Sequence, residues 1–163
     1  WRIDVGVDPD FLVRLYEIRQ AVEPAAAAVA ATRRTPTHLE KMREHLDRMN
    51  QPGHTRLTYA EQDLHFHQEI LMASENPFMQ SFTSIIEASI LCAFQISAPI
   101  DTTERQSLSI ERHAEVLRAI NDRDAVRASA AMSQVIVEGL ENAHFALAKN
   151  PITISLPLKL DAA

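Results

Sequence analysis

The residue types best suited to chemistry in this chain lie in residues 61–70, which read EQDLHFHQEI. Asp63 and His67 are four residues apart, so on a helix their side chains lie one turn apart on the same face. A carboxylate and an imidazole at this spacing can bind one metal ion together. His65 lies about 200° around the helix from Asp63 and cannot join them. Such pairs also occur on helix surfaces without a metal, so the motif alone leaves both interpretations open.

Helices must position these side chains, and the composition favours helices. The 163 residues include only three glycines and many alanines, and alanine has the highest helix propensity. Hydrophobic residues make up 46% of the chain and charged residues 23%, which is the balance of one globular domain with a substantial core. Apolar residues recur at helical spacing along most of the chain. We therefore expect an all-α fold, an antiparallel bundle of six to seven helices.

Capping residues and prolines predict where these helices begin and end. The expected start signals are Asp8 with Pro9, Thr37 with Glu40, Asn76 with Pro77, Asp101 with Glu104, and Asp122 or Asp124. The corresponding helices cover about 8–34, 37–50, 57–75, 77–96, 102–121 and 125–149, and the third of them carries Asp63 and His67. Pro24 falls inside the first pattern and should kink or split that helix.

Two segments show apolar patterns that a single amphipathic helix does not explain. The segment 77–96 is apolar on more than one side, which indicates a central helix or one that also meets a second subunit. The segment 152–160 alternates apolar and polar residues as a strand does. A lone strand has no sheet to join in a helical bundle, so we expect a tail packed on the bundle or on another subunit.

Charge, cysteine content and hydropathy exclude several classes of function. A formal charge of −6 argues against this chain binding nucleic acid by itself, because phosphate contacts need a basic face. The lone Cys92 excludes a disulfide framework and indicates a reducing, cytoplasmic compartment. No apolar run approaches the roughly 18 residues of a membrane span, so we expect no membrane association.

Six short segments occur in a characteristic order and spacing. They are residues 15–24 (LYEIRQAVEP), 30–33 (AATR), 63–67 (DLHFH), 73–77 (ASENP), 113–120 (HAEVLRAI) and 124–132 (DAVRASAAM). Together they resemble the C-terminal ligand-binding (FCD) domain of FadR-type regulators in the GntR family of bacterial transcription factors. The resemblance implies a connector at 1–7 from an N-terminal DNA-binding domain, an effector-binding domain at 8–149 and a C-terminal tail at 150–163.

The resemblance also implies an interior divalent metal site. By motif, its ligands are Asp63 and His67 together with His113 on a later helix. The family's fourth ligand position falls at Val135, where this chain has no ligand. Three protein ligands and an open position suit a site at which water or a carboxylate must bind the metal. Two imidazoles favour zinc, with nickel as the alternative.

The effector that the resemblance implies is a small carboxylate, with sugar acids as a candidate class. Arg19 corresponds to a family arginine that points into the effector cavity, and a guanidinium can bind a carboxylate through two parallel hydrogen bonds. A surface pair with Glu23, four residues on, is an equal alternative for Arg19. Ser109 lies one turn before His113 and is a second candidate effector contact. The histidines that match no family position, His38, His45, His54 and His144, are expected on the surface.

The predicted function is therefore that of an effector-sensing and dimerisation domain, not an enzyme. We expect a homodimer that reaches operator DNA only through the N-terminal winged-helix domain. The alternative is a single-metal enzyme on a helical bundle, but such an enzyme needs a general base near the metal. Glu61 and Glu69 do not share the face of Asp63 and His67. Di-iron chemistry is disfavoured because the Glu-x-x-His spacing occurs only once, at Glu141 and His144.

Overall fold

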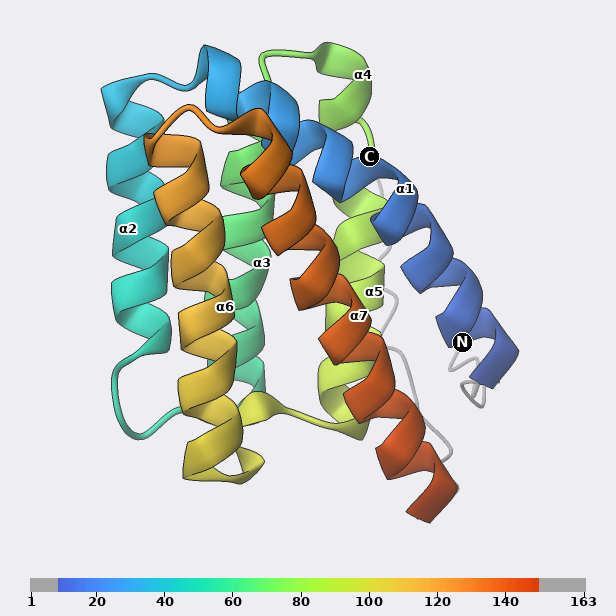
Figure 1. The fold of residues 1–163 in the computed structure, drawn as a ribbon. Coiled ribbons are helices and arrows are strands. Elements are labelled where there is room, and N and C mark those ends of the chain that lie inside the picture. The colour runs from blue at the N-terminus through green and yellow to red at the C-terminus, as the bar shows by residue number, and fades with distance from the viewer. Residues whose placement is uncertain (1–8, 150–163) are drawn as a thin grey trace, which may run out of the picture.

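The computed structural model describes residues 9–149, which form an antiparallel bundle of α-helices (Figure 1). The six long helices are α1 (Pro9–Arg33), α2 (Pro36–Met49), α3 (Arg56–Ala73), α5 (Thr83–Ile96), α6 (Thr103–Asn121) and α7 (Ala125–Lys149). A four-residue helix, α4 (Pro77–Gln80), and a 3-10 turn, η1 (Pro99–Asp101), lie on either side of α5. No strand occurs within residues 9–149. The predicted all-α bundle is confirmed. The Asp8 cap, the connector at 1–7 and the tail at 150–163 lie outside the described residues.

Helix α1 is the element around which the bundle is built, because it packs against α3, α5, α6 and α7. Its second half buries Ala26, Ala27, Ala30 and Ala31. Alanine side chains are short, so neighbouring backbones can approach this half of the helix closely. The first half buries Leu12 and Tyr16, with Arg19 and Glu23 on the same inner side.

Pro24 does not split α1, which runs unbroken from Pro9 to Arg33. Of the two expected effects of Pro24, a kink or a split, the split does not occur. A proline removes one backbone hydrogen bond and crowds the preceding turn. Here the buried side chains on both sides of Pro24 hold the two halves in one helix, which is how packing overrides a local breaker.

The segment predicted as one helix over 77–96 is broken between α4 and α5. Hydroxyl groups compete for the backbone carbonyls at this point: Ser81 Oγ donates to the Phe78 carbonyl at 2.7 Å, and Thr83 Oγ1 donates to the Gln80 carbonyl at 2.7 Å. Such local side-chain bonds favour a bend over a continuous helix. Asn76 caps α4 as predicted, its Oδ1 accepting the Phe78 N–H at 3.0 Å.

The same segment is more apolar than the sequence analysis allowed. An 18-residue stretch within residues 77–101 has a mean hydropathy of 1.4, which by length and composition alone would suit a membrane helix. However, the segment is divided into α4, α5 and η1, and α5 has 14 residues, or roughly 21 Å against a hydrocarbon core of about 30 Å. The inner face of α5 supplies Ile86, Ile90 and Ile96 to the core. Core packing thus accounts for this apolar segment.

Two helix starts differ from the predicted ones. Helix α2 begins after Thr35 rather than at Thr37: Thr35 Oγ1 accepts the His38 N–H, and His38 Nδ1 accepts the Thr35 N–H, both at 3.3 Å. Pro36 then occupies the first helical position, where its missing N–H costs nothing. Helix α6 is capped by Thr102 rather than Asp101. Asp124 Oδ1 accepts the Arg127 N–H at 3.0 Å, so Asp124 is the cap of α7.

Three of the four histidines expected on the surface are instead half-buried and bonded. His38 completes the α2 cap, and His45 Nδ1 lies 3.1 Å from Gln62 Oε1. His54 Nε2 lies 2.7 Å from the Arg48 carbonyl and so joins the end of α2 to the loop before α3. Only His144 among the four is exposed. These contacts explain the histidines as structural residues of the α2–α3 hairpin.

Candidate metal and effector site

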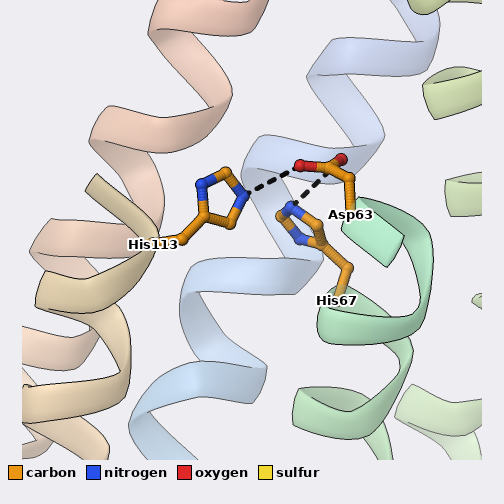
Figure 2. Close-up of side chains that lie close together, drawn as sticks. All are labelled: Asp63, His67 and His113. Atoms are coloured by element: carbon orange, nitrogen blue, oxygen red, sulfur yellow. Dashed lines mark ion pairs between the residues drawn. The ribbon is translucent and has the colours of Figure 1, made fainter. Parts of the chain in front are cut away.

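Three side chains from two helices converge in the interior of the bundle (Figure 2). Asp63 and His67 come from α3, and His113 comes from α6; all three are buried. One ligand atom from each lies within 4.8 Å of the other two. Ligands bound to zinc at about 2.0–2.2 Å are at most about 4.4 Å apart, so small side-chain adjustments would bring all three to one ion. The geometric expectation that these residues surround one point is met.

Both imidazoles are held through Nδ1, which leaves Nε2 facing Asp63. His113 Nδ1 lies 2.7 Å from the Ser109 carbonyl, which can only accept, so Nδ1 carries the proton. His67 Nδ1 bonds to a carboxylate oxygen of Glu23 in the same way. Metal-binding histidines usually donate their second N–H to a carboxylate or a carbonyl, which orients the ring. Both rings are thus oriented as metal ligands are.

Of the two imidazole Nε2 atoms at the centre, that of His67 has a partner, Arg19 Nη2 at 3.5 Å, and that of His113 does not. His113 Nε2 is 3.0 Å from Asp63 Oδ1 but has no partner in hydrogen-bond geometry. His67 Nε2 is 3.9 Å from Asp63 Oδ2. Unpaired buried polar atoms are costly and rare. A divalent cation between these atoms would satisfy all three, so the residues present fit such an ion, and two imidazoles with one carboxylate suit zinc or nickel.

The charged groups that meet here shift the pKa values of Asp63 and His113. Burial by itself would raise the pKa of Asp63, but His113, His67 and Arg19 hold it below its ordinary value. Burial by itself would lower the pKa of His113, but the Asp63 carboxylate raises it above its ordinary value. Asp63 and His113 therefore each favour the charged form of the other.

Glu23, expected on the surface as a partner of Arg19, is instead buried beside His67. One carboxylate oxygen bonds to His67 Nδ1 and the other accepts Arg19 Nε at 2.5 Å. Only 1% of Glu23 and 4% of Arg19 are exposed. Burial alone would raise the pKa of Glu23, but Arg19 and His67 lower it to about 2. The i,i+4 spacing of Arg19 and Glu23 was visible, but the periodicity of α1 did not show that the pair faces inward.

Arg19 lies beside the metal ligands rather than on the surface. Its Nη2 is 3.5 Å from His67 Nε2, and its guanidinium carbon lies 5.2 Å from the centre of the Tyr16 ring. Burial lowers and Glu23 raises the pKa of Arg19, and the net direction is upward, so the side chain stays charged. A ligand carboxylate next to the metal would therefore lie within reach of a buried positive charge.

These residues line a cavity that extends from the buried centre toward partly exposed side chains. The water-accessible space inside it is about 50 Å³, and one water needs about 10–15 Å³ of such space. Ser109 and Val135 line it, as does Arg105 at the start of α6. Ser109 Oγ accepts a hydrogen bond from Tyr59 Oη at 3.1 Å. Val135 thus lines the same cavity as the three candidate ligands and contributes an apolar side chain to its wall.

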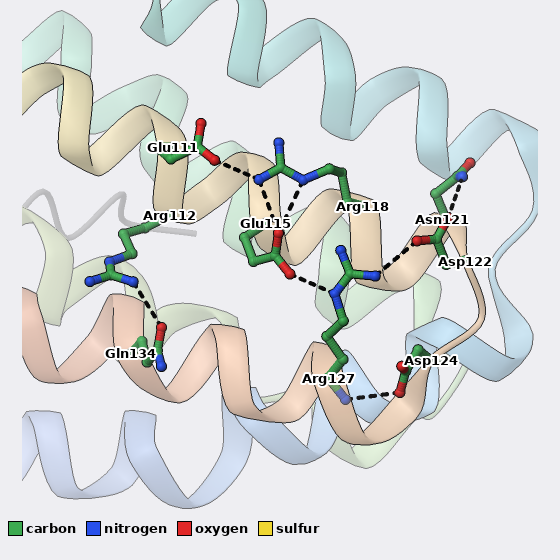
Figure 3. Close-up of polar contacts among 9 residues, drawn as sticks. All are labelled: Glu111, Arg112, Glu115, Arg118, Asn121, Asp122, Asp124, Arg127 and Gln134. Atoms are coloured by element: carbon green, nitrogen blue, oxygen red, sulfur yellow. Dashed lines mark hydrogen bonds and ion pairs between the residues drawn. The ribbon is translucent and has the colours of Figure 1, made fainter.

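Charged side chains join α6, which carries His113, to α7, which carries Val135, and several of these polar contacts are drawn in Figure 3. Arg127 of α7 binds Glu115 Oε1 at 2.6 Å and Asp122 Oδ2 at 3.0 Å. Arg118 binds Glu115 as well, at 2.9 Å. Each exposed ion pair is weak because water screens it, but together these pairs join the C-terminal end of α6 to the first turn of α7.

Comparison with known proteins identifies the family. The sequence pattern of the FCD domain family matches residues 14–138, which make up most of the chain. The chain belongs to the FCD domain family. This FCD domain is 26% identical over 136 residues to the galactonate operon transcriptional repressor of Escherichia coli (strain K12), covering 83% of this chain and 59% of that protein.

Solved structures agree with this assignment. Streptococcus agalactiae GntR has a TM-score of 0.68 at 26% identity, covering 83% of this chain and 61% of that one. E. coli McbR/YncC has a TM-score of 0.72 at 16% identity, covering 85% and 70%, which supports the fold alone. The FCD domain described here thus spans about three fifths of the galactonate repressor and of the streptococcal GntR. The recognition of an FCD domain of the GntR-family regulators is confirmed, and the E. coli relative at 26% identity is a transcriptional repressor rather than an enzyme.

Proposed function

We propose that this FCD domain is the effector-sensing part of a GntR-family transcriptional repressor, and that it binds a small carboxylic acid through a divalent metal. The metal ligands are Asp63, His67 and His113. The observation that supports this most directly is the orientation of the two imidazoles. Each has its Nδ1 bonded to an acceptor and its Nε2 turned toward the Asp63 carboxylate.

The metal, zinc with nickel as the alternative, would supply a Lewis-acidic site for the effector carboxylate. Arg19 would share that carboxylate, because its guanidinium lies next to His67. Ser109 would donate a hydrogen bond from its hydroxyl group to the effector, since its oxygen already accepts one from Tyr59. The absence of a ligand at Val135 leaves a coordination position open for the effector. A sugar acid is the favoured class, in keeping with the name of the E. coli relative.

We further propose that the domain acts as a homodimer and controls an N-terminal winged-helix domain that binds operator DNA in the cytoplasm. The fraction of the relatives that this chain spans leaves room for such a domain. The net charge of −6 assigns DNA binding to it rather than to the FCD domain. Phe78 and Ile85, on α4 and α5, are 79% and 37% exposed and are candidate interface residues. Light scattering at micromolar concentration should give the mass of two chains, and a monomer mass would contradict this part.

Metal analysis combined with calorimetry tests the metal and effector site. Protein purified without chelators should contain about one divalent ion per chain, and galactonate should bind the metal-loaded form but not the stripped form. His113→Ala should lose both the bound metal and the binding of galactonate. It should remain helical, because the apolar core residues that hold the helices together do not depend on His113. His144→Ala, at an exposed histidine, is the matched control and should behave as the wild type. If the protein holds no stoichiometric metal and zinc leaves its melting temperature unchanged, the proposed function is wrong.

A further inference from the structure

Arg105 has an unpaired buried atom in the same cavity as the proposed metal site. Its Nε is buried and has no hydrogen-bond partner. His113 Nε2, which lies 3.0 Å from Asp63 Oδ1, is the other buried side-chain atom of that cavity without a partner in hydrogen-bond geometry among residues 9–149. The first atom is a donor and the second faces the metal position. The cavity therefore offers two separate points at which a bound molecule would satisfy a buried polar atom.

These two points lie along one face of α6. Arg105, Ser109 and His113 follow one another at intervals of four residues, so they lie on the same side of the helix, one turn apart. The rise between the Cα atoms of Arg105 and His113 is roughly 12 Å. A molecule held at both points must be elongated, and it would pass the Ser109 hydroxyl on the way.

The charge around Arg105 is not balanced by the protein. Its Nη1 lies 3.6 Å from Asp101 Oδ2, but both oxygens of Asp101 already accept Arg56 Nη2 at 3.0 Å. Two arginines therefore share one carboxylate. The other two cavity arginines each have a carboxylate within bonding distance: Arg112 binds Glu138 at 3.3 Å, and Arg19 binds Glu23.

Helix stability does not explain a positive charge at this position. Arg105 is the third residue of α6, whose N-terminus carries the positive end of the helix dipole. A cation here is mildly unfavourable for the helix. Its Nη2 donates to Ser97 Oγ at 2.8 Å, and both Arg105 and Ser97 line the cavity.

We propose that Arg105 binds a second carboxylate of the effector, which makes the effector a dicarboxylic acid lying along α6. This inference rests on the proposed function, because the first carboxylate occupies the metal and Arg19. The second carboxylate accepts hydrogen bonds from Nε and an Nη atom of Arg105, the paired geometry for which guanidinium is suited. Its charge offsets the surplus that Arg105 and Arg56 share.

Two acids that differ only at one end test the proposal. Galactonate carries a carboxylate at one end of a six-carbon chain, and galactarate carries one at both ends. Hydrogen bonds to a charged group predict that the zinc-loaded domain binds galactarate roughly 10- to 100-fold more tightly than galactonate in calorimetry. The unhydroxylated pair adipate and hexanoate should show the same preference, which separates the effect of the carboxylate from that of the hydroxyl groups.

Substitution of Arg105 then shows whether that residue is responsible. In Arg105→Gln the ratio of the two affinities should fall to about one, and Arg105→Lys, which keeps the charge but loses Nε, should give an intermediate ratio. Arg43→Gln, at an exposed arginine of α2, should keep the wild-type ratio. Circular dichroism and melting temperatures confirm that each variant is folded.

The outcomes separate this inference from the proposed function. If the wild type binds galactonate through zinc but does not prefer galactarate, the role of Arg105 is wrong and the proposed function stands. The same holds if Arg105→Gln keeps the preference. If the zinc-loaded domain binds none of the four acids, both the inference and the carboxylate part of the proposed function are wrong.

Discussion

Replacing Glu23 with glutamine removes the one carboxylate that serves both Arg19 and His67. Glu23 is 1% exposed, and Arg19 and His67 lower its pKa from 4.5 to about 2 against the opposing effect of burial. A pKa difference of this size corresponds to about 3 kcal/mol of folding free energy. Breaking a buried ion pair by removing one partner costs a similar amount, about 3–5 kcal/mol, because it leaves an uncompensated buried charge.

We therefore expect Glu23→Gln to lower the free energy of unfolding of the metal-free domain by about 3 kcal/mol at pH 7. Urea unfolding followed by circular dichroism measures this directly. Because the folded pKa of Glu23 is depressed, its contribution is fully present above about pH 4.5 and is lost as the pH falls toward about 2. The difference between wild type and variant should shrink over that same interval.

Two further variants separate the buried pair from other effects. Glu17→Gln, at an exposed glutamate of the same helix, should stay within about 0.5 kcal/mol of wild type. Removing both charges in Arg19→Gln/Glu23→Gln should restore part of the lost stability, because no unpaired charge remains.

In addition, zinc affinity should fall roughly 10- to 100-fold in Glu23→Gln, since His67 loses its orienting partner. Unchanged stability together with unchanged zinc affinity in Glu23→Gln would refute this reasoning.

Three other substitutions or conditions have defined outcomes. Because the pKa of His113 is raised, the metal-free domain should lose stability as the pH rises from about 6.5. The zinc-loaded domain should instead gain stability over the same range, because protons stop competing with zinc for the ligands. Melting temperatures of the two forms at pH 6 and pH 8 should therefore change in opposite directions. Val135→His should tighten zinc binding and weaken galactonate binding in calorimetry, because a fourth ligand takes the open position. Gly139→Ala places a Cβ 2.9 Å from Tyr16 Oη and should cost about 1–3 kcal/mol in urea unfolding; equal stability would mean that Tyr16 moves freely.

Local features that depend on only a few neighbouring residues were readable from the sequence. The helical geometry of α3 alone places Asp63 and His67 on one face, since four residues make slightly more than one turn. Asn76 and Pro77 start α4 because the cap and the first helical position need only their own backbone and side chains. The low glycine content and the apolar periodicity likewise determine an all-α bundle. His113 was assigned from the resemblance to a known family, because nothing in its immediate sequence connects it to α3.

Competition among neighbouring signals limited the prediction of boundaries. Thr35 and Thr37 can both cap α2, and the pairing of Thr35 with His38 decides between them. Ser81 and Thr83 break the apolar run after α4 by bonding to carbonyls of the preceding turn. Helix propensity sums over a window, so it does not resolve which of several adjacent hydroxyls takes a given backbone partner.

Only the tertiary structure decided which polar residues share the interior. Glu23 is 44 residues from His67 in sequence, and the two meet because α1 crosses α3 with that face inward. The sequence does not show that Arg105 lacks a carboxylate of its own. In the structure Asp101 is bound by Arg56, and the Nε atom of Arg105 has no hydrogen-bond partner. The physical reason is that a periodic pattern shows which face of a helix is apolar, whereas the rotation and crossing of packed helices determine which side chains from different helices meet.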